Sequence, residues 1–411
     1  MGDQAVSVVI VSRHRAAALL RCLRGVAQLQ YPNFEVVVVA DPEGLEAIDT
    51  LDGMDAVKRV GFDEGNISAA RNLGVSHAAG EIIAFIDDDA VPEPSWLRHL
   101  CAPAARQDVA AMGGFVRGRN GISWQNRARI LDRHGAAQEI EVDPLQATVM
   151  VAPKGRAIKT EGTNMAVRRD VLVALGGFDP AFRFFLDETD LNMRLAWAGH
   201  ATALVPLAQV HHGFAASARR RNDRVPRDLT EIGASWAVFQ RKHVAKDDRA
   251  AHWAGIRAAE RRRLLTHMVA GRLEPRDVRR LMRGLRRGYD AGLARPFGGG
   301  AIPRHSVRAF QRFETRRADP GFNAVPWRKR AQAMQAAADR VRAGGIETVL
   351  ILTRTALFHR VSFEANGVWV QRGGIYGKAE RSEPLVRLTT RARRAARERR
   401  RMAQVRGHDA G

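Results

Sequence analysis

The stretch EIIAFIDDD, residues Glu81–Asp89, joins a short apolar run to three adjacent aspartates. The run 81–86 is apolar and short, which predicts a buried strand. Three carboxylates at the end of a strand repel one another and are costly to desolvate, so they need a counter-charge. Mg²⁺ or Mn²⁺ suits this role, because such ions bind carboxylates and fill their other positions with phosphate oxygens and water. The pattern favours a metal holding a phosphorylated ligand at the carboxyl edge of a sheet, with a solvated acidic turn or helix N-cap as the alternative.

Apolar runs and amphipathic segments alternate on both sides of this stretch. Strands are expected at Val6–Val11, Phe34–Ala40, Ala110–Val116, Met165–Arg168 and Ala203–Val205, and helices at Leu19–Leu29, Ile67–Ala79, Pro94–Arg106 and Glu188–Ala198. Strands that alternate with helices predict a mostly parallel sheet covered on both faces. The four valines Val36–Val39 suit a strand buried on both sides. The predicted fold class of this half is α/β.

The charge of the chain is distributed unevenly. Residues 1–214 contain 21 Lys/Arg and 26 Asp/Glu, a net charge of −5, whereas residues 215–411 contain 45 and 18, a net charge of +27. The length predicts two to three domains. We expect a catalytic unit over 1–215, a basic and mainly helical region over 216–345, and a small strand and hairpin segment with an arginine-rich tail over 346–411. The basic half predicts an anionic partner.

The second half has a few local signals of its own. Helices are expected at Leu229–His243 and Asp277–Tyr289, a strand at Val349–Leu352, a hairpin around Asn366-Gly367, and seven arginines fall within Arg391–Arg401. No apolar run reaches 18 residues, so no membrane span is expected. The start of the chain has no signal-peptide pattern, and the two cysteines show no metal or redox spacing. These features predict a cytoplasmic protein.

Five segments, in order, resemble the inverting family 2 glycosyltransferases of the GT-A fold. They are Val8–Arg15, Phe34–Asp41, Gly65–Gly74, the triplet Asp87–Asp89, and the region from Gly176 to Gly199 that contains Asp187-Glu188-Thr189-Asp190. Together they cover roughly residues 5–215. The resemblance implies a GT-A catalytic domain that binds a nucleoside-diphosphate sugar, with UDP as the expected nucleotide, and the metal Mn²⁺ or Mg²⁺.

The resemblance also implies roles for individual residues. The catalytic base would be Glu188, with Asp187 as the runner-up, and the metal ligands would be Asp89 and His211. Donor-binding residues would be Ser12, Arg13, Asp41, Asn66, Arg71, Asp87 and Asp88, and acceptor-binding residues would be Gly162, Thr163, Asn164 and Asp190. Two positions depart from the family pattern. Ala40 replaces an acidic residue, and the acidic pair Asp187-Glu188 has the reverse of the usual order.

The chemistry of these residues fits a glycosyl transfer. A diphosphate leaves poorly unless a cation neutralises its developing charge, and an inverting transfer needs a base for the acceptor hydroxyl. Asp87 and Asp89, two residues apart on an extended segment, point the same way, whereas Asp88 faces away. Alternation also lets only one of His211 and His212 face the site, and His211 is slightly favoured.

The leading hypothesis is a glycosyltransferase that acts on a glycan or lipid-linked acceptor in surface polysaccharide synthesis. One alternative is a sugar-nucleotide nucleotidyltransferase, although Ser12–Arg15 lacks the glycine of a phosphate loop. The other is a non-enzymatic nucleic-acid-binding protein, which leaves the acidic motifs unexplained. Basic segments such as Arg391–Arg401 would bring the enzyme to an anionic membrane surface, and nucleic acid is the less favoured partner.

Overall fold

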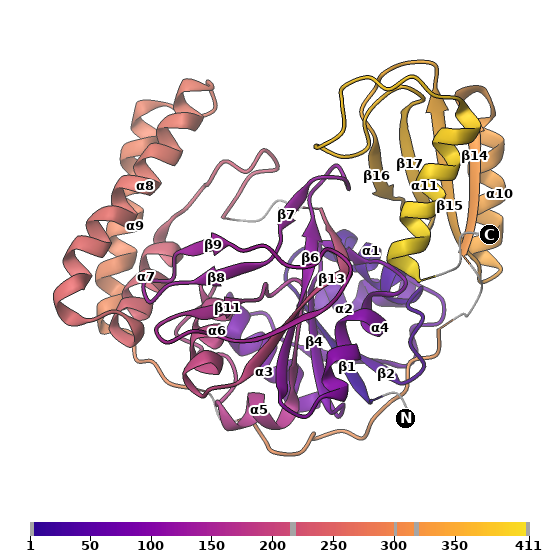
Figure 1. The fold of residues 1–411 in the computed structure, drawn as a ribbon. Coiled ribbons are helices and arrows are strands. Elements are labelled where there is room, and N and C mark those ends of the chain that lie inside the picture. The colour runs from indigo at the N-terminus through magenta and orange to yellow at the C-terminus, as the bar shows by residue number, and fades with distance from the viewer. Residues whose placement is uncertain (1–3, 214–218, 300–301, 316–319, 408–411) are drawn as a thin grey trace.

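The structure, a computed structural model, describes residues 4–213, 219–299, 302–315 and 320–407. A large mixed sheet forms its centre, in the order β10-β13-β6-β12-β4-β1-β2-β3 (Figure 1). These strands are β1 (Val6–Ser12), β2 (Phe34–Ala40), β3 (Val57–Gly61), β4 (Ile82–Asp87), β6 (Val109–Arg117), β10 (Thr148–Val151), β12 (Met165–Arg168) and β13 (Ala201–His212). The strands β3, β2, β1 and β4 are parallel, and β12 runs antiparallel between β4 and β6. The predicted fold class, a mostly parallel sheet flanked by helices, is confirmed.

Helices cover both faces of this sheet. One apolar cluster packs α1 (Ala16–Val26), α2 (Pro42–Ala47) and α4 (Trp96–Cys101) on one face. A second cluster packs α3 (Ile67–His77), α5 (Arg169–Ala174) and α6 (Asp187–Trp197) on the other. Short strands complete the unit: β5 (Ala90–Pro92) pairs with β13, β7 (Trp124–Asn126) pairs with β6, and β8 (Arg129–Leu131), β9 (Ala137–Glu139) and β11 (Ala157–Lys159) form a separate sheet. Valine-rich strands are buried on both sides, as the sequence predicts.

Several expected elements have different bounds in the structure. The helix expected over Pro94–Arg106 is only α4, followed by a 3-10 turn over Ala102–Ala105. The strand expected over Ala203–Val205 extends to His212, so both histidines lie in a strand rather than after a connection. No element was expected at β3, at α2 or at the helix over Arg249–Val269. The boundary expected at residues 215 and 216 lies outside the described residues.

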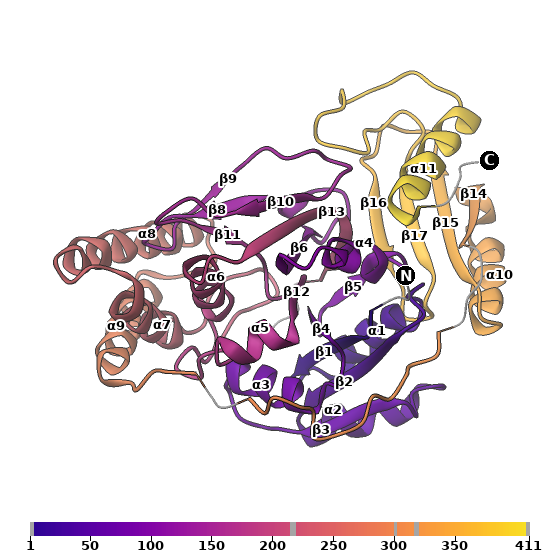
Figure 2. The same cartoon turned by 60° about the horizontal axis from the view of Figure 1, so that its bottom comes forward.

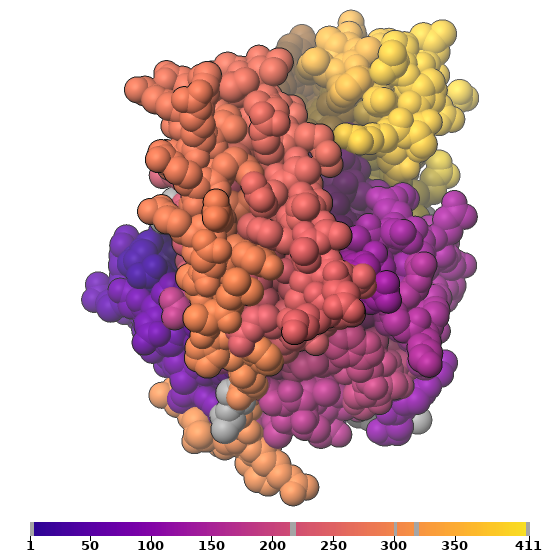
Figure 3. Space-filling view, turned by 90° about the vertical axis from the view of Figure 1, so that its left-hand side faces the viewer, coloured from indigo at the N-terminus to yellow at the C-terminus, as the bar shows by residue number. Residues whose placement is uncertain are grey.

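Three helices extend from the catalytic unit. Helix α7 (Thr230–His243) packs along α9 (Pro275–Ala294), and α8 (Arg249–Val269) pairs with α9. Small residues allow this close packing: a Cβ on Gly288 would lie 1.8 Å from the carbonyl oxygen of Thr230. In Figure 3 the helices α8 and α9 form one continuous outer surface on this side of the molecule.

A small α/β domain closes the chain. Its sheet has the order β14-β15-β17-β16, formed by β14 (Pro320–Pro326), β15 (Ile346–Thr353), β16 (Arg360–Phe363) and β17 (Trp369–Gly374). Helices α10 (Arg330–Arg342) and α11 (Arg391–Arg406) belong to it. The antiparallel pairing of β16 and β17 confirms the hairpin predicted at Asn366-Gly367, where Gly367 has a φ of 82°. This sheet begins at Pro320, within the range expected to be mainly helical.

The described residues 295–299 and 302–315, which follow α9 in the chain, lie along the outside of the unit built on the large sheet (Figure 2). They are anchored by backbone hydrogen bonds from Val307 to Ser76 and from Phe313 to Phe34. Ile302 and Phe313 each fill one of the two main apolar clusters. Among the described residues, the helices are too short or too polar to cross a membrane.

Candidate functional site

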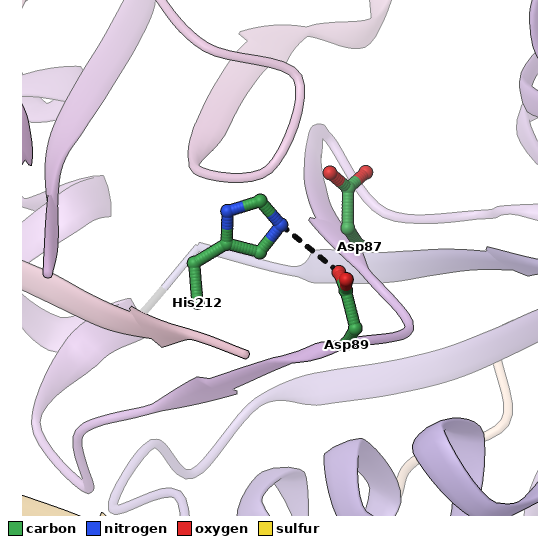
Figure 4. A group of neighbouring side chains, drawn as sticks. All are labelled: Asp87, Asp89 and His212. Carbon is green, nitrogen blue, oxygen red and sulfur yellow. Dashed lines mark hydrogen bonds and ion pairs between the residues drawn. The ribbon is translucent and has the colours of Figure 1, made fainter. Parts of the chain in front are cut away.

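The acidic triplet lies at the carboxyl end of β4, as the sequence predicts. Asp87 is the last residue of β4, and Asp88 and Asp89 form the turn that leads into β5. Strand β5 pairs with the end of β13, which places His212 opposite Ala90. Ligand atoms of Asp87, Asp89 and His212 lie within 4.8 Å of one another, and the Nε2 atom of His212 is 3.0 Å from a carboxylate oxygen of Asp89 (Figure 4).

Asp88 points away from this cluster, towards the end of β1. Its carboxylate accepts a hydrogen bond of 2.7 Å from the Ser12 hydroxyl and pairs with the Arg15 guanidinium at 2.6 Å. Burial raises the pKa of Asp88 to about 7, although Arg15 and Ser12 both favour the ionised form. Asp88 therefore ties the triplet to β1, and the same arginine reaches Asp89 at 3.6 Å.

Arg71 connects the two acidic regions of the chain. It lies on α3 and is 3% exposed. One of its nitrogens bonds to Asp187 at the start of α6, and another is 3.1 Å from Asp87. Gly162 makes this position possible, because a Cβ there would lie 2.5 Å from the Arg71 guanidinium. Two carboxylates about a hundred residues apart thus share one buried cation.

Asp187 and Glu188 begin α6 after a strained residue. Leu186 has a φ of 67°, a left-handed conformation that costs a non-glycine residue about 1–2 kcal/mol. Strain of this kind is concentrated at functional sites, where the surrounding structure holds it in place. Here it turns the chain so that both carboxylates enter the site from the first turn of the helix.

The two carboxylates of this pair have different surroundings. Asp187 is 2% exposed, and burial raises its pKa to about 7 although Arg71 opposes the shift. The side chain of Glu188 is 20% exposed, and one of its oxygens is 2.6 Å from the ammonium group of Lys159. Burial opposes ionisation of Glu188, but Lys159 outweighs it and lowers the pKa to about 2. Glu188 is the more accessible and the more readily ionised carboxylate.

The residues expected to bind the acceptor lie beside this pair, mostly engaged in structural contacts. Asn164 is fully buried, accepts a hydrogen bond from the Trp96 indole, and donates to two backbone carbonyls. Asp190 is also buried and bonds to Arg194, Lys242 and His243, which hold its pKa low despite burial. Asn164 and Asp190 thus have their polar atoms bonded to partners within the fold. Thr163 is buried next to Gly162.

The residues expected at the nucleotide end gather at the ends of β1 and β2. Asp41 is buried and accepts a hydrogen bond of 2.8 Å from the backbone of His14. Arg13 is half exposed and pairs with Asp63 at 2.8 Å. Asn66 caps α3 through a hydrogen bond from the Ala69 backbone. The arrangement is open to solvent at Arg13.

His211 and His212 point to opposite sides of β13, as alternation predicts. The Nε2 atom of His211 is 2.8 Å from Glu93, and its ring packs against Trp369. His212 is the histidine beside Asp89, so it replaces the slightly favoured His211 as the candidate metal ligand. Arg15 and Lys159 were not singled out by the sequence argument, because a lone cation gives no signal until the fold places it next to a carboxylate.

The charges of the site fit a divalent cation. Five carboxylates are joined by ion pairs to three permanent cations; the carboxylates are Asp87, Asp88, Asp89, Asp187 and Glu188, and the cations are Arg15, Arg71 and Lys159. Lys159 is also 3.9 Å from Glu161, and Asp89 interacts electrostatically with Arg220. Two carboxylates and one imidazole form a donor set of oxygens and a nitrogen that Mn²⁺ or Mg²⁺ accepts. Asp87, Asp89 and His212 are the residues that would hold such an ion.

Comparison with known proteins identifies the family. The family model described as "Glycosyltransferase like family 2" matches residues 3–231, more than half of the chain. The chain therefore belongs to glycosyltransferase-like family 2. This confirms the predicted family and the class of enzyme that it implies, the glycosyltransferases.

Individual relatives are more distant. The chain is 28% identical over 253 residues to the O-antigen biosynthesis protein RfbC of Myxococcus xanthus, a match that covers 58% of this chain and 19% of that protein. It is 27% identical over 214 residues to the succinoglycan biosynthesis protein ExoM of Rhizobium meliloti, covering 49% of this chain and 64% of that one. The chain thus spans less than two thirds of the length of each of these curated relatives.

Two solved structures illustrate the structural neighbours. The first is described as GalNAc-T7 with UDP, GalNAc and Mn²⁺, with a TM-score of 0.44, 16% identity, and coverage of 58% of this chain and 48% of that one. The second is the mannosyltransferase PcManGT from Pyrobaculum calidifontis with GDP-Man and Mn²⁺, with a TM-score of 0.41, 17% identity, and coverage of 72% and 88%.

Replacing Arg71 tests the electrostatic centre of the site. Arg71→Met should lower the free energy of unfolding by about 3–5 kcal/mol, because it leaves a buried carboxylate, Asp187, without its partner. The matched control is Arg13→Met, which breaks a half-exposed pair with Asp63 and should cost about 1 kcal/mol or less. Denaturant unfolding of both variants at pH 7 measures the difference. Equal losses would show that Arg71 does not compensate buried charge.

Proposed function

We propose that this chain is an inverting, metal-dependent glycosyltransferase that uses a nucleoside-diphosphate sugar, with UDP as the favoured nucleotide. The observation that carries the proposal is the joining of two acidic groups through Arg71. Asp87 belongs to the metal cluster and Asp187 belongs to the pair that would supply the base, and both contact the same guanidinium. A transfer reaction needs these two functions side by side.

The donor would lie along the carboxyl edge of β1, β2 and β4. Asp41 and Arg13 stand at the nucleotide end, and Asp87, Asp89 and His212 would hold the ion. When bound, the divalent cation neutralises charge on the diphosphate as it leaves. Asp88 contributes indirectly, because its bonds to Ser12 and Arg15 fix the turn that presents Asp89.

Glu188 is the favoured base. A base must reach the acceptor hydroxyl and must be ionised. The side chain of Glu188 is partly exposed, so it can meet an acceptor hydroxyl, whereas Asp187 is buried against Arg71. In this role Glu188 takes the proton from the hydroxyl on the side opposite the leaving diphosphate, which inverts the anomeric centre. Lys159 orients the carboxylate, and Asp187 holds Arg71.

The acceptor class is suggested by the relatives. The Myxococcus and Rhizobium proteins are described as acting in O-antigen and succinoglycan biosynthesis, and a further relative from Haloferax volcanii, 27% identical over 189 residues, is described as a glucosyl-dolichyl phosphate glucuronosyltransferase. These descriptions support a glycan or lipid-linked acceptor in surface polysaccharide synthesis for this chain.

Asp89→Asn should abolish glycosyl transfer while leaving the fold intact. The change removes the charge of one proposed ligand and is nearly isosteric, so the lost function would be metal binding. The measurement is transfer or donor hydrolysis against a panel of nucleotide sugars, with Mn²⁺ titrated in and with EDTA. Asp108→Asn, an exposed aspartate far from the triplet in the sequence, is the control. Substantial activity of Asp89→Asn in EDTA would refute the metal site.

Glu188→Gln should reduce turnover by about two to four orders of magnitude while donor affinity stays near normal, as expected when a general base is removed. Asp187→Asn should cost less in turnover, because Asp187 acts through Arg71. Single-turnover kinetics together with a donor-binding titration separate the two effects. Equal and mild losses in both variants would mean that neither carboxylate is the base.

The pH profile gives a second check on the base. Lys159 lowers the pKa of Glu188, so Lys159→Met should raise that pKa. Since the base is needed in its ionised form, the acidic limb of the kcat/KM profile should move to higher pH in this variant. Lys154→Met, which removes an exposed lysine nearby in the sequence, should leave the limb in place. An unmoved limb in Lys159→Met would remove Glu188 from this role.

The basic half is proposed to attract the enzyme to an anionic membrane surface. Arginines of the basic half cluster in two places, the helices α8 and α9 and the helix α11. The hairpin α8–α9, residues 249–294, contains 12 arginines and four acidic residues, and its outward arginines are exposed. The arginines of α11 are partly internal, because Arg394 is buried and Arg401 pairs with Glu383 and Glu398. The hairpin is therefore the better candidate surface.

Vesicle sedimentation at varied anionic lipid content tests this surface. The triple variant Arg279→Gln, Arg283→Gln, Arg287→Gln neutralises one exposed stripe of α9 and should weaken binding by about 100-fold, at about 1 kcal/mol for each arginine. The control neutralises Arg393, Arg399 and Arg400, which are exposed on α11. Equal binding of wild type and the α9 variant would exclude the hairpin. Binding to nucleic acid with no preference for anionic vesicles would favour the rival partner.

A further inference from the structure

The C-terminal domain contacts the catalytic unit beside the proposed metal site. The contact is made by Arg406, the last residue of α11, which is 2% exposed. Its Nε atom is 2.9 Å from a carboxylate oxygen of Glu93, and its Nη1 atom donates to the Thr348 hydroxyl at 3.0 Å. Its guanidinium also lies 5.3 Å from the ring centroid of Trp369. A side chain from the end of the chain thus reaches a residue four positions after Asp89.

Glu93 connects Arg406 to the end of β13. Its second carboxylate oxygen is 2.8 Å from the Nε2 atom of His211, and its backbone N–H donates to the Gln209 carbonyl at 3.0 Å. The His211 ring packs edge-on against Trp369, with 5.0 Å between centroids. Burial raises the pKa of Glu93, but Arg406 and His211 together outweigh it and lower the pKa to about 2.

The same interface supports the strand on the other side of the metal cluster. Val91, in β5, packs with Ile346, Phe363 and Trp369 of the C-terminal domain. Strand β5 begins directly after Asp89, and it pairs with β13 so that Val91 faces His211 and Ala90 faces His212. The C-terminal domain therefore packs against β5, which directly follows Asp89, and against the end of β13, which carries His212.

The register of the end of β13 needs such support. Beside β6, the pairing of β13 is irregular between Val205 and Gln209, so the regular ladder upstream does not determine which residue follows in register. A slip of one residue turns every side chain to the opposite face. Here a slip would exchange His211 and His212, and the imidazole beside Asp89 would be lost. Holding His211 on one face fixes His212 on the other.

We propose that Arg406 is a positioning residue for the metal site, acting through Glu93 and His211 to keep His212 directed at Asp89. This inference rests on the proposed metal site, and it gives the C-terminal domain a role in the catalytic unit. The buried ion pair is not needed for packing, since apolar residues of similar volume stabilise an interface at least as well. The pair adds direction, because the two oxygens of Glu93 are bonded to different partners, one to Arg406 and the other to His211.

Mn²⁺ binding by the full chain, followed by the loss of the electron paramagnetic resonance signal of free Mn²⁺, tests the proposal without requiring turnover. Arg406→Ala should weaken Mn²⁺ binding about tenfold, the lower end of the loss seen when residues that orient a ligand are replaced. Arg406→Lys should recover part of the affinity, because the charge returns without the second hydrogen bond. Glu93→Gln should weaken binding to a similar degree and serves as a second route should Arg406→Ala unfold.

The matched control is Arg394→Ala. Arg394 is buried on the same helix, but its bonds to the Gly377 carbonyl and to His359 lie within the C-terminal domain. This variant should keep the wild-type Mn²⁺ affinity even if the domain loses stability. Wild-type affinity in Arg406→Ala, or an equal loss in Arg394→Ala, would overturn the positioning role. If the wild type itself binds no Mn²⁺, the proposed metal site fails, and the inference fails with it.

Discussion

The site is built around one electrostatic constraint, the crowding of carboxylates at the edge of a buried sheet. Arg71 is buried between Asp87 and Asp187 and contacts both. Its position requires a glycine at 162 and fixes α3 against the start of α6. The acidic turn after β4 and the acidic start of α6 therefore cannot be placed independently.

A second consequence concerns how the proposed metal ligands are oriented. Asp87 and Asp89 are two residues apart in sequence, so the chain itself nearly fixes their relative position. His212 comes from a strand more than a hundred residues later, and the pairing of β13 with β6 is irregular between Val205 and Gln209. Beyond that point β13 pairs with β6 again and with β5, and Glu93, Trp369 and Arg406 pack against this end of the strand. A domain that looks like an appendage in the sequence is thus packed against the strand that carries the proposed ligand His212.

The sequence predicted what local patterns determine. The apolar runs located β1, β2, β4, β6 and β12 within a few residues, and the spacing of Asp87 and Asp89 correctly placed both on one side with Asp88 on the other. It missed what depends on distant partners. Arg15 and Lys159 are ordinary cations until the fold sets them beside Asp88 and Glu188. The choice between His211 and His212 needed the register of β13, and the tail 391–401 was expected to face an anionic surface because nothing local shows that Arg394 is buried.

The basic half shows why net charge alone is a poor guide to function. Its excess of arginine divides into two populations with different physical effects. Arg394, Arg401 and Arg406 are buried or paired, so their fields are cancelled by Glu93, Glu383 and Glu398 over a few ångströms. The arginines on the outer faces of α8 and α9 face solvent, where a field acts over about a Debye length of 8–10 Å. Exposed arginines of this kind, together with Arg393, Arg399 and Arg400 on α11, can attract a distant anionic surface. Figure 1 places α8 and α9 on the side of β7 opposite the C-terminal domain, so the two parts of the basic region flank the unit built on the large sheet.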